Sequence, residues 1–151
     1  MSKIETRLKE LGLSLTDAKP PVGNYVGSKK IGDLLFASGR VSDQIGEVGT
    51  EVTEQQAKDA ARDTVLRILA IVKKDIVNLD LLVGVVKVTG FIRSSPGFTD
   101  QPKVLDGASN LLISLFGEAG RHARTATGVA QLPFGASVQL DIIFHFKASE
   151  S

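Results

Sequence analysis

Three polar residues near the C-terminal end of the chain have the types and spacing of a small-molecule binding site. Arg124 opens a strand-like run, and Gln139 and Asp141 alternate along the next one. Arginine suits a carboxylate ligand, because its planar fork of donors matches both carboxylate oxygens. Gln139 and Asp141 share one strand face, about 7 Å apart. Asp141 could act as a base or orient a water, so these residues predict a small-carboxylate site with hydrolytic potential.

The two charged residues, Arg124 and Asp141, also have purely structural interpretations. Arg124 could make an ion pair with an acid such as Asp141, because charged groups in proteins are usually solvated or paired. Asp141 could equally be a hydrogen-bonded polar residue at an interface. Both alternatives remain open at this point.

Other site chemistries find less support. The chain has no cysteine, and its two histidines, His122 and His145, have no acid at metal-ligand spacing. His122 directly follows an expected helix, where a surface role near the helix terminus is the simplest interpretation. The glycine-rich stretch 23–27 lacks the lysine and Ser/Thr of a phosphate loop, and there is no Gly-x-Ser-x-Gly nucleophile elbow. We therefore expect no metal site.

The bulk properties indicate an ordinary globular protein. The 151 residues are expected to form one domain, with an N-terminal helical extension (1–20) and a core (21–146). Eighteen basic and 17 acidic residues leave no basic excess, which disfavours a nucleic-acid partner. The N-terminus does not resemble a signal peptide, and no apolar run reaches the roughly 20 residues needed to span a bilayer. A cytoplasmic location is expected.

The elements that position the polar residues follow the order β-β-α-β-α-β-β. Strands are expected as a hairpin over 25–39 and then over 81–92, 125–132 and 137–146, with helices over 3–11, 53–77 and 103–119. Thr53 and Gln56 form a capping-box pattern at the start of the long helix, and Gly120 is the expected C-terminal cap of the last. The pattern predicts an α+β fold, a mixed sheet with both long helices on one face.

The last strand shows the two-residue period of a sheet with one covered face. One face is apolar and should pack on the helices; it holds Val138, Leu140, Ile142, Phe144 and Phe146. The other face carries Gln139, Asp141 and His145 among its residues. A face with no helical layer over it makes oligomerisation plausible.

Several segments together resemble the reactive-intermediate deaminase (Rid) family, also described as L-PSP endoribonucleases or translation inhibitors. The resemblance covers about residues 20–146. Its carriers are VGNYV (22–26), LFASGR (35–40), TEQQA (53–57), ART (123–125), GVA (128–130) and LPFGA (132–136). The segment LFGEAGRH (115–122) looks like a branch distinct from the best-studied deaminases.

The resemblance implies a chorismate-mutase-like α+β fold assembled as a homotrimer, with clefts at the subunit interfaces that bind small carboxylates. Active members hydrolyse enamines and imines, such as 2-aminoacrylate and 2-iminopropionate, to a keto acid and ammonia, without cofactor or metal. Arg124 matches the family arginine that holds the carboxylate. Tyr25, Ser38 and Gly39 look like the other substrate-binding residues.

One departure from the family pattern leaves the activity open. Active members often carry a glutamate on the last strand where this chain has Gln139, and glutamine cannot take up a proton. The first hypothesis is therefore an imine deaminase, in which Gln139 or Asp141 directs a water. The alternative is a non-catalytic carboxylate-binding trimer, a metabolite sensor or chaperone-like protein. The near-neutral charge disfavours the third reading, an endoribonuclease.

Overall fold

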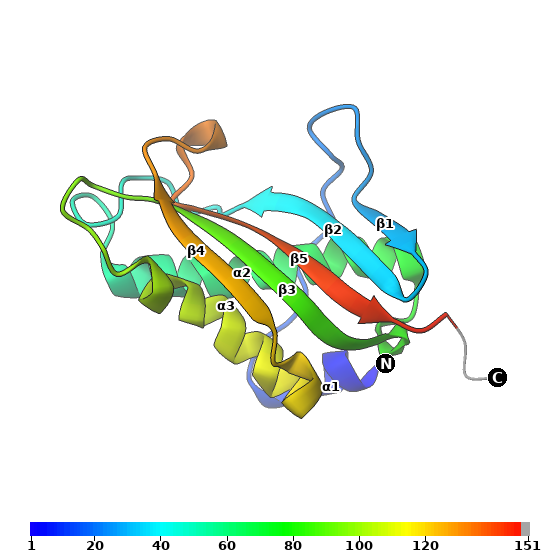
Figure 1. Ribbon diagram of the computed structural model, residues 1–151. Coiled ribbons are helices and arrows are strands. Elements are labelled where there is room, and N and C mark those ends of the chain that lie inside the picture. The colour runs from blue at the N-terminus through cyan, green and yellow to red at the C-terminus, as the bar shows by residue number, and fades with distance from the viewer. Residues whose placement is uncertain (149–151) are drawn as a thin grey trace.

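The computed structural model describes residues 1–148 and shows the expected α+β architecture (Figure 1). The strands are β1 (Ser28–Ile31), β2 (Leu34–Val41), β3 (Leu82–Arg93), β4 (Ala123–Val129) and β5 (Val138–Phe146). The helices are α1 (Lys3–Glu10), α2 (Glu54–Ile76) and α3 (Gln101–Phe116), with 3-10 turns η1 (Leu79–Leu81), η2 (Gly117–Gly120) and η3 (Pro133–Gly135). One sheet runs in the order β1-β2-β5-β3-β4. It is mixed, because β3 and β4 pair in parallel and the other neighbours pair antiparallel.

The helix ends follow local capping chemistry. Thr53 Oγ1 accepts from the backbone N–H of Gln56 (3.1 Å), and Gln56 Oε1 accepts from that of Thr53 (2.9 Å), so the predicted capping box is confirmed. The expected cap at Gly120 is wrong, since α3 ends at Phe116 and Gly117 is its C-terminal cap. Gly117 has a φ of 64°, a left-handed conformation that glycine adopts at little cost, and the chain then tightens into η2.

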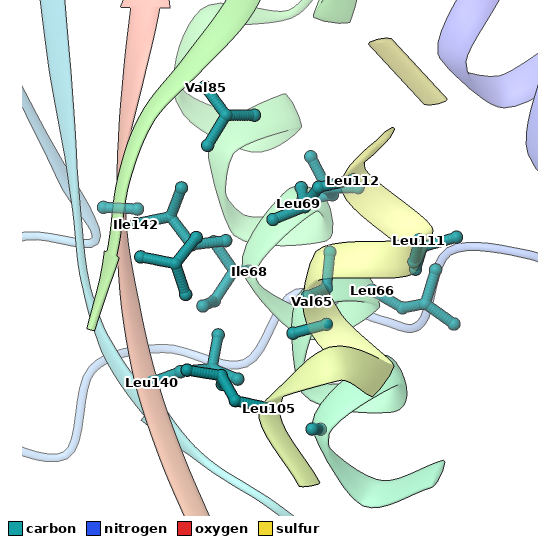
Figure 2. Close-up of a cluster of buried hydrophobic side chains, with 14 of the residues drawn as sticks. Val65, Leu66, Ile68, Leu69, Val85, Leu105, Leu111, Leu112, Leu140 and Ile142 are labelled. Carbon is teal, nitrogen blue, oxygen red and sulfur yellow. The ribbon is translucent and has the colours of Figure 1, made fainter. Parts of the chain in front are cut away.

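The core lies between the sheet and the helices α2 and α3. Figure 2 shows Leu140 and Ile142 of β5 facing side chains that project from both helices. The apolar face of β5 is buried as predicted: Val138, Leu140, Ile142, Phe144 and Phe146 are each at most 5% exposed. Residues 1–20 are more than an extension, because Ile4 and Leu8 of α1 are buried in the same core.

The opposite face of the sheet carries no helix within the described chain (Figure 1). Gln139, Asp141 and Ile143 are half-buried there, and His145 is exposed. We call this the open face. Apolar side chains on or beside it also remain accessible, with Phe36 39% and Val86 40% exposed.

The close approach of α2 and α3 depends on Gly107. A Cβ at this position would lie 2.0 Å from the carbonyl oxygen of Lys58, so Gly107→Ala must push the helices apart. We expect a loss of about 2–3 kcal/mol in the free energy of unfolding, measured by urea denaturation. Gly97→Ala is the matched control, because no atom lies within 4 Å of its Cβ position. Equal stability of the two variants would contradict the tight packing of α2 on α3.

Candidate carboxylate-binding site

Arg124 lies on β4, the edge strand of the sheet, and points to the helix-covered side. The parallel register pairs it with Val88, which is fully buried beneath the helices. Its Nη1 donates to Asp106 Oδ1 (2.6 Å) and Ser109 Oγ (3.2 Å) of α3, and its Nη2 donates to the carbonyl of Pro102 (3.3 Å). The structure therefore shows an ion pair, but with Asp106 and not with Asp141.

The guanidinium of Arg124 still has donors to offer. An arginine carries five N–H donors, and three of them are used by Asp106, Ser109 and Pro102. The Nε–H and one Nη2–H have no partner among residues 1–148. The side chain is 25% exposed, so a ligand can reach it at the edge of the sheet. Arg124 can thus hold a carboxylate while Asp106 holds Arg124.

A hydrogen-bonded chain behind Arg124 involves His122. The two nitrogens of His122 lie 2.6 Å (Nδ1) from the carbonyl of Gly120 and 2.9 Å (Nε2) from Ser109 Oγ. A carbonyl only accepts, so Nδ1 carries a proton. In the neutral ring Nε2 then accepts from the Ser109 hydroxyl, whose oxygen accepts from Arg124. His122 thus supports the arginine and is not the simple surface residue that we expected.

Gln139 and Asp141 share the open face, as predicted. In the sheet, Asp141 pairs with Thr89 and Gln139 pairs with Phe91, both on β3. Arg124 lies on the other side of the sheet. The arginine therefore does not lie beside the polar face of β5 within one chain, contrary to our expectation. The β3–β4 register turns Thr125 and Thr127 of β4 to the open face and Arg124 to the helix side.

Ser38 and Gly39 form a bulge in β2, between Ala37 and Arg40. A Cβ on Gly39 would lie 3.5 Å from Gln139 Nε2, so the glycine lies directly beside the Gln139 amide. The Ser38 hydroxyl donates to the carbonyl of Val26 (2.6 Å), which ties β2 to the preceding loop. Tyr25 lies in that loop and is 46% exposed. Gly39 is thus a neighbour of Gln139, which shares the open face with Asp141. The hydroxyl of Ser38 is used in a structural hydrogen bond.

Comparison with known proteins decides the family. A model of the "YjgF/chorismate mutase-like, putative endoribonuclease" family matches residues 5–146. The chain belongs to this family. The resemblance to Rid and L-PSP proteins seen in the sequence is thereby confirmed, together with the α+β fold.

Proteins with quite different names are similar to this chain. The Trypanosoma cruzi protein TCP17 is 39% identical over 148 residues (93% of this chain and 92% of the relative). A 2-iminobutanoate/2-iminopropanoate deaminase of Dermatophagoides farinae is 28% identical over 126 residues (83% and 88%). A crystal structure of an Agrobacterium tumefaciens protein with unknown function superposes with a TM-score of 0.89 at 41% identity, covering 96% of this chain and 93% of that one.

Sequence reasoning missed an arginine on the open face of this YjgF family member. Arg93 ends β3 on the same face as Phe91, and its Nη1 donates to the carbonyl of Gly135 (3.2 Å). Its Nε is buried with no hydrogen-bond partner among residues 1–148. The alternation of residues 87–93 in β3 was the signal that could have placed a cation on the side of Gln139. Asp106 and Ser109 were also missed, since they stand in an ordinary amphipathic helix.

No group of three or more His, Asp or Glu side chains among residues 1–148 is arranged to hold a metal ion. None of the helices in the described part of the chain is both long and apolar enough to cross a membrane.

Burial raises the pKa of Asp141 above its ordinary value, and the nearby Lys87 only partly opposes this effect. Burial destabilises the charged form of this carboxylate. Its cost to the free energy of unfolding is absent below the pKa that Asp141 has in the unfolded chain, and it grows as the pH rises through the pKa in the folded protein. We expect Asp141→Asn to raise the melting temperature at pH 7 and to leave it nearly unchanged at about pH 3. A variant that is less stable than wild type at pH 7 would contradict this burial penalty.

Proposed function

We propose that this protein hydrolyses imines and enamines derived from 2-amino acids, such as 2-iminopropionate and 2-aminoacrylate, to a keto acid and ammonia. The observation that carries the proposal is Arg124, held from behind by Asp106 and Ser109 with two donors to spare at the exposed sheet edge. This residue matches the family arginine that binds the substrate carboxylate. The similarity to a 2-iminobutanoate/2-iminopropanoate deaminase supports the same substrate class.

The proposal includes a homotrimer with the substrate clefts between subunits. Arg124 and the pair of Gln139 and Asp141 lie on opposite sides of the sheet, so a cleft that holds all three needs residues from a second copy. The open face supplies a surface for such a contact, because apolar side chains such as Phe36 and Val86 stay accessible on or beside it.

In the proposed reaction, Arg124 binds the carboxylate of the imine and fixes the position of its C=N carbon. Gln139 hydrogen-bonds a water, which adds to that carbon. Asp141, whose pKa is raised by burial, gives its proton to the imine nitrogen and takes up one proton from the added water. Asp141 then passes that proton to the amino group of the resulting carbinolamine and takes up the proton of its hydroxyl. The C–N bond breaks, which releases ammonia and leaves the keto acid.

Carboxylate binding without chemistry is the second candidate. Gln139 favours it, because an amide cannot serve as the base that activates water. General acid–base catalysis contributes about 10²–10⁴-fold to a rate, so its absence could leave a binder only.

The decisive experiment generates 2-iminopropionate from alanine with an amino-acid oxidase in the presence of semicarbazide, which traps the imine. A deaminase lowers the semicarbazone yield and raises free pyruvate by the same amount, while total ammonia stays unchanged because trapping and hydrolysis each release one ammonia per imine. The second candidate predicts an unchanged semicarbazone yield together with binding of pyruvate, measured by calorimetry.

A further inference from the structure

Arg40 is a buried cation without a counter-charge. Its side chain lies on the helix side of β2, in register with Leu140, and the residue is only 7% exposed. Nη2 donates to the carbonyl of Lys19 (3.1 Å), and the buried Nε has no partner within residues 1–148. No carboxylate in the described chain pairs with it. Burying an unpaired charge is costly, so buried guanidinium groups normally meet an anion.

Arg40 lines a cavity whose walls combine cations with apolar side chains. The cavity has a volume of about 270 Å³. Its lining includes Lys19, Arg40 and Arg67, with Val22, Ile45 and Phe134 as apolar members. This volume lies just below the ~300–1,000 Å³ typical of pockets for drug-sized ligands, so only a small molecule fits.

The single acid in the cavity wall is already engaged. Asp43 accepts a hydrogen bond from Arg67, and this bond holds the pKa of Asp43 below its ordinary value. Arg67 also donates to the carbonyl of Val41 (2.7 Å). Asp43 therefore pairs with Arg67 and also feels the more distant charge of Lys19, so one acid faces three cations and a net positive charge remains for a ligand.

The local backbone gives the cavity its shape. The bulge at 38–39 shifts the alternation of β2, which turns Arg40 to the helix side. Phe134 in η3 has a φ of 61° and is 70% exposed, an unusual conformation for an aromatic residue. Its apolar ring is one of the side chains that line the cavity.

We propose that this cavity binds a small organic carboxylate with a short apolar chain. The carboxylate pairs with Arg40 and Lys19, and the chain packs against Val22, Ile45 and Phe134. Within one chain the site is separate from Arg124, because β5 and β3 lie between β2 and β4 in the sheet. It is also separate from Gln139 and Asp141, because Arg40 lies on the helix side and they lie on the open face. The proposed binding at Arg40 therefore does not depend on whether the protein hydrolyses imines.

The test uses the full chain with Arg124→Gln, which disables the proposed substrate site, and sodium butanoate as the probe. Calorimetry is expected to show butanoate binding to this variant and none of its neutral analogue butanamide. Adding Arg40→Gln is expected to weaken butanoate binding about tenfold or more, since hydrogen bonds to a charged group are lost. Adding Arg121→Gln, an exposed arginine outside the cavity lining, leaves binding unchanged.

A second variant guards against misfolding of Arg40→Gln. Val22 is 72% exposed, so Val22→Glu preserves the core and places a carboxylate at the cavity. It is expected to abolish butanoate binding in a protein that keeps its far-ultraviolet dichroism. The proposal is overturned if the Arg124→Gln protein does not bind butanoate, if butanamide binds equally well, or if binding survives Val22→Glu.

Discussion

Arg124→Ala is expected to lower kcat/KM for 2-iminopropionate hydrolysis by about 10²–10³-fold, because the variant loses the guanidinium that fixes the substrate carboxylate. The loss falls on orientation as well as on affinity, so raising the imine concentration does not restore the rate. The measurement is pyruvate release by the purified variant beside wild type, over a range of imine concentrations.

Asp106→Asn is the matched control for this variant. It breaks the same ion pair but leaves the guanidinium of Arg124 in place. We expect the Asp106→Asn protein to keep most of the activity, since Ser109 and the carbonyl of Pro102 still hold the arginine. Equal losses of activity in the two variants would show that the broken ion pair, and not the missing guanidinium, causes the loss. That result would contradict a substrate-binding role for Arg124.

Gln139→Glu is expected to raise imine hydrolysis about 10²-fold, at the lower end of the usual contribution of a general base. The side chains have nearly the same size, and Gly39 beside Gln139 leaves space for either. The gain should fall away at acid pH as the new carboxylate becomes protonated. Hydrolysis rates from pH 5 to pH 8 for wild type, Gln139→Glu and Gln139→Leu test this expectation. Equal rates for Gln139→Glu and Gln139→Leu would exclude position 139 from the chemistry.

The strongly periodic elements could be predicted from the sequence. Alternation along 138–146 assigned every buried residue of β5 to the correct face, and the capping box placed the start of α2 at the right residue. Both signals are local, because side-chain direction and capping depend only on near neighbours in the chain. The end of α3 was misplaced, since two glycines, Gly117 and Gly120, could each have ended it.

The side of the sheet that Arg124 faces could not be predicted. Residues 123–129 read ARTATGV, and small side chains on both faces leave no alternation of polarity. The register with β3 decides the face, and that is a long-range property. The bond between Ser109 and His122 could not be predicted for a similar reason, because it depends on how the η2 turn brings β4 back against α3.

The most direct test of the central claim is the pyruvate and ammonia released from 2-aminoacrylate generated in situ, with and without the wild-type protein. The proposed function predicts faster release of both products, in equal amounts and in proportion to the protein concentration. Release no faster than in buffer, from a protein that binds pyruvate by calorimetry, would contradict deaminase activity and leave carboxylate binding as the function of the Arg124 site.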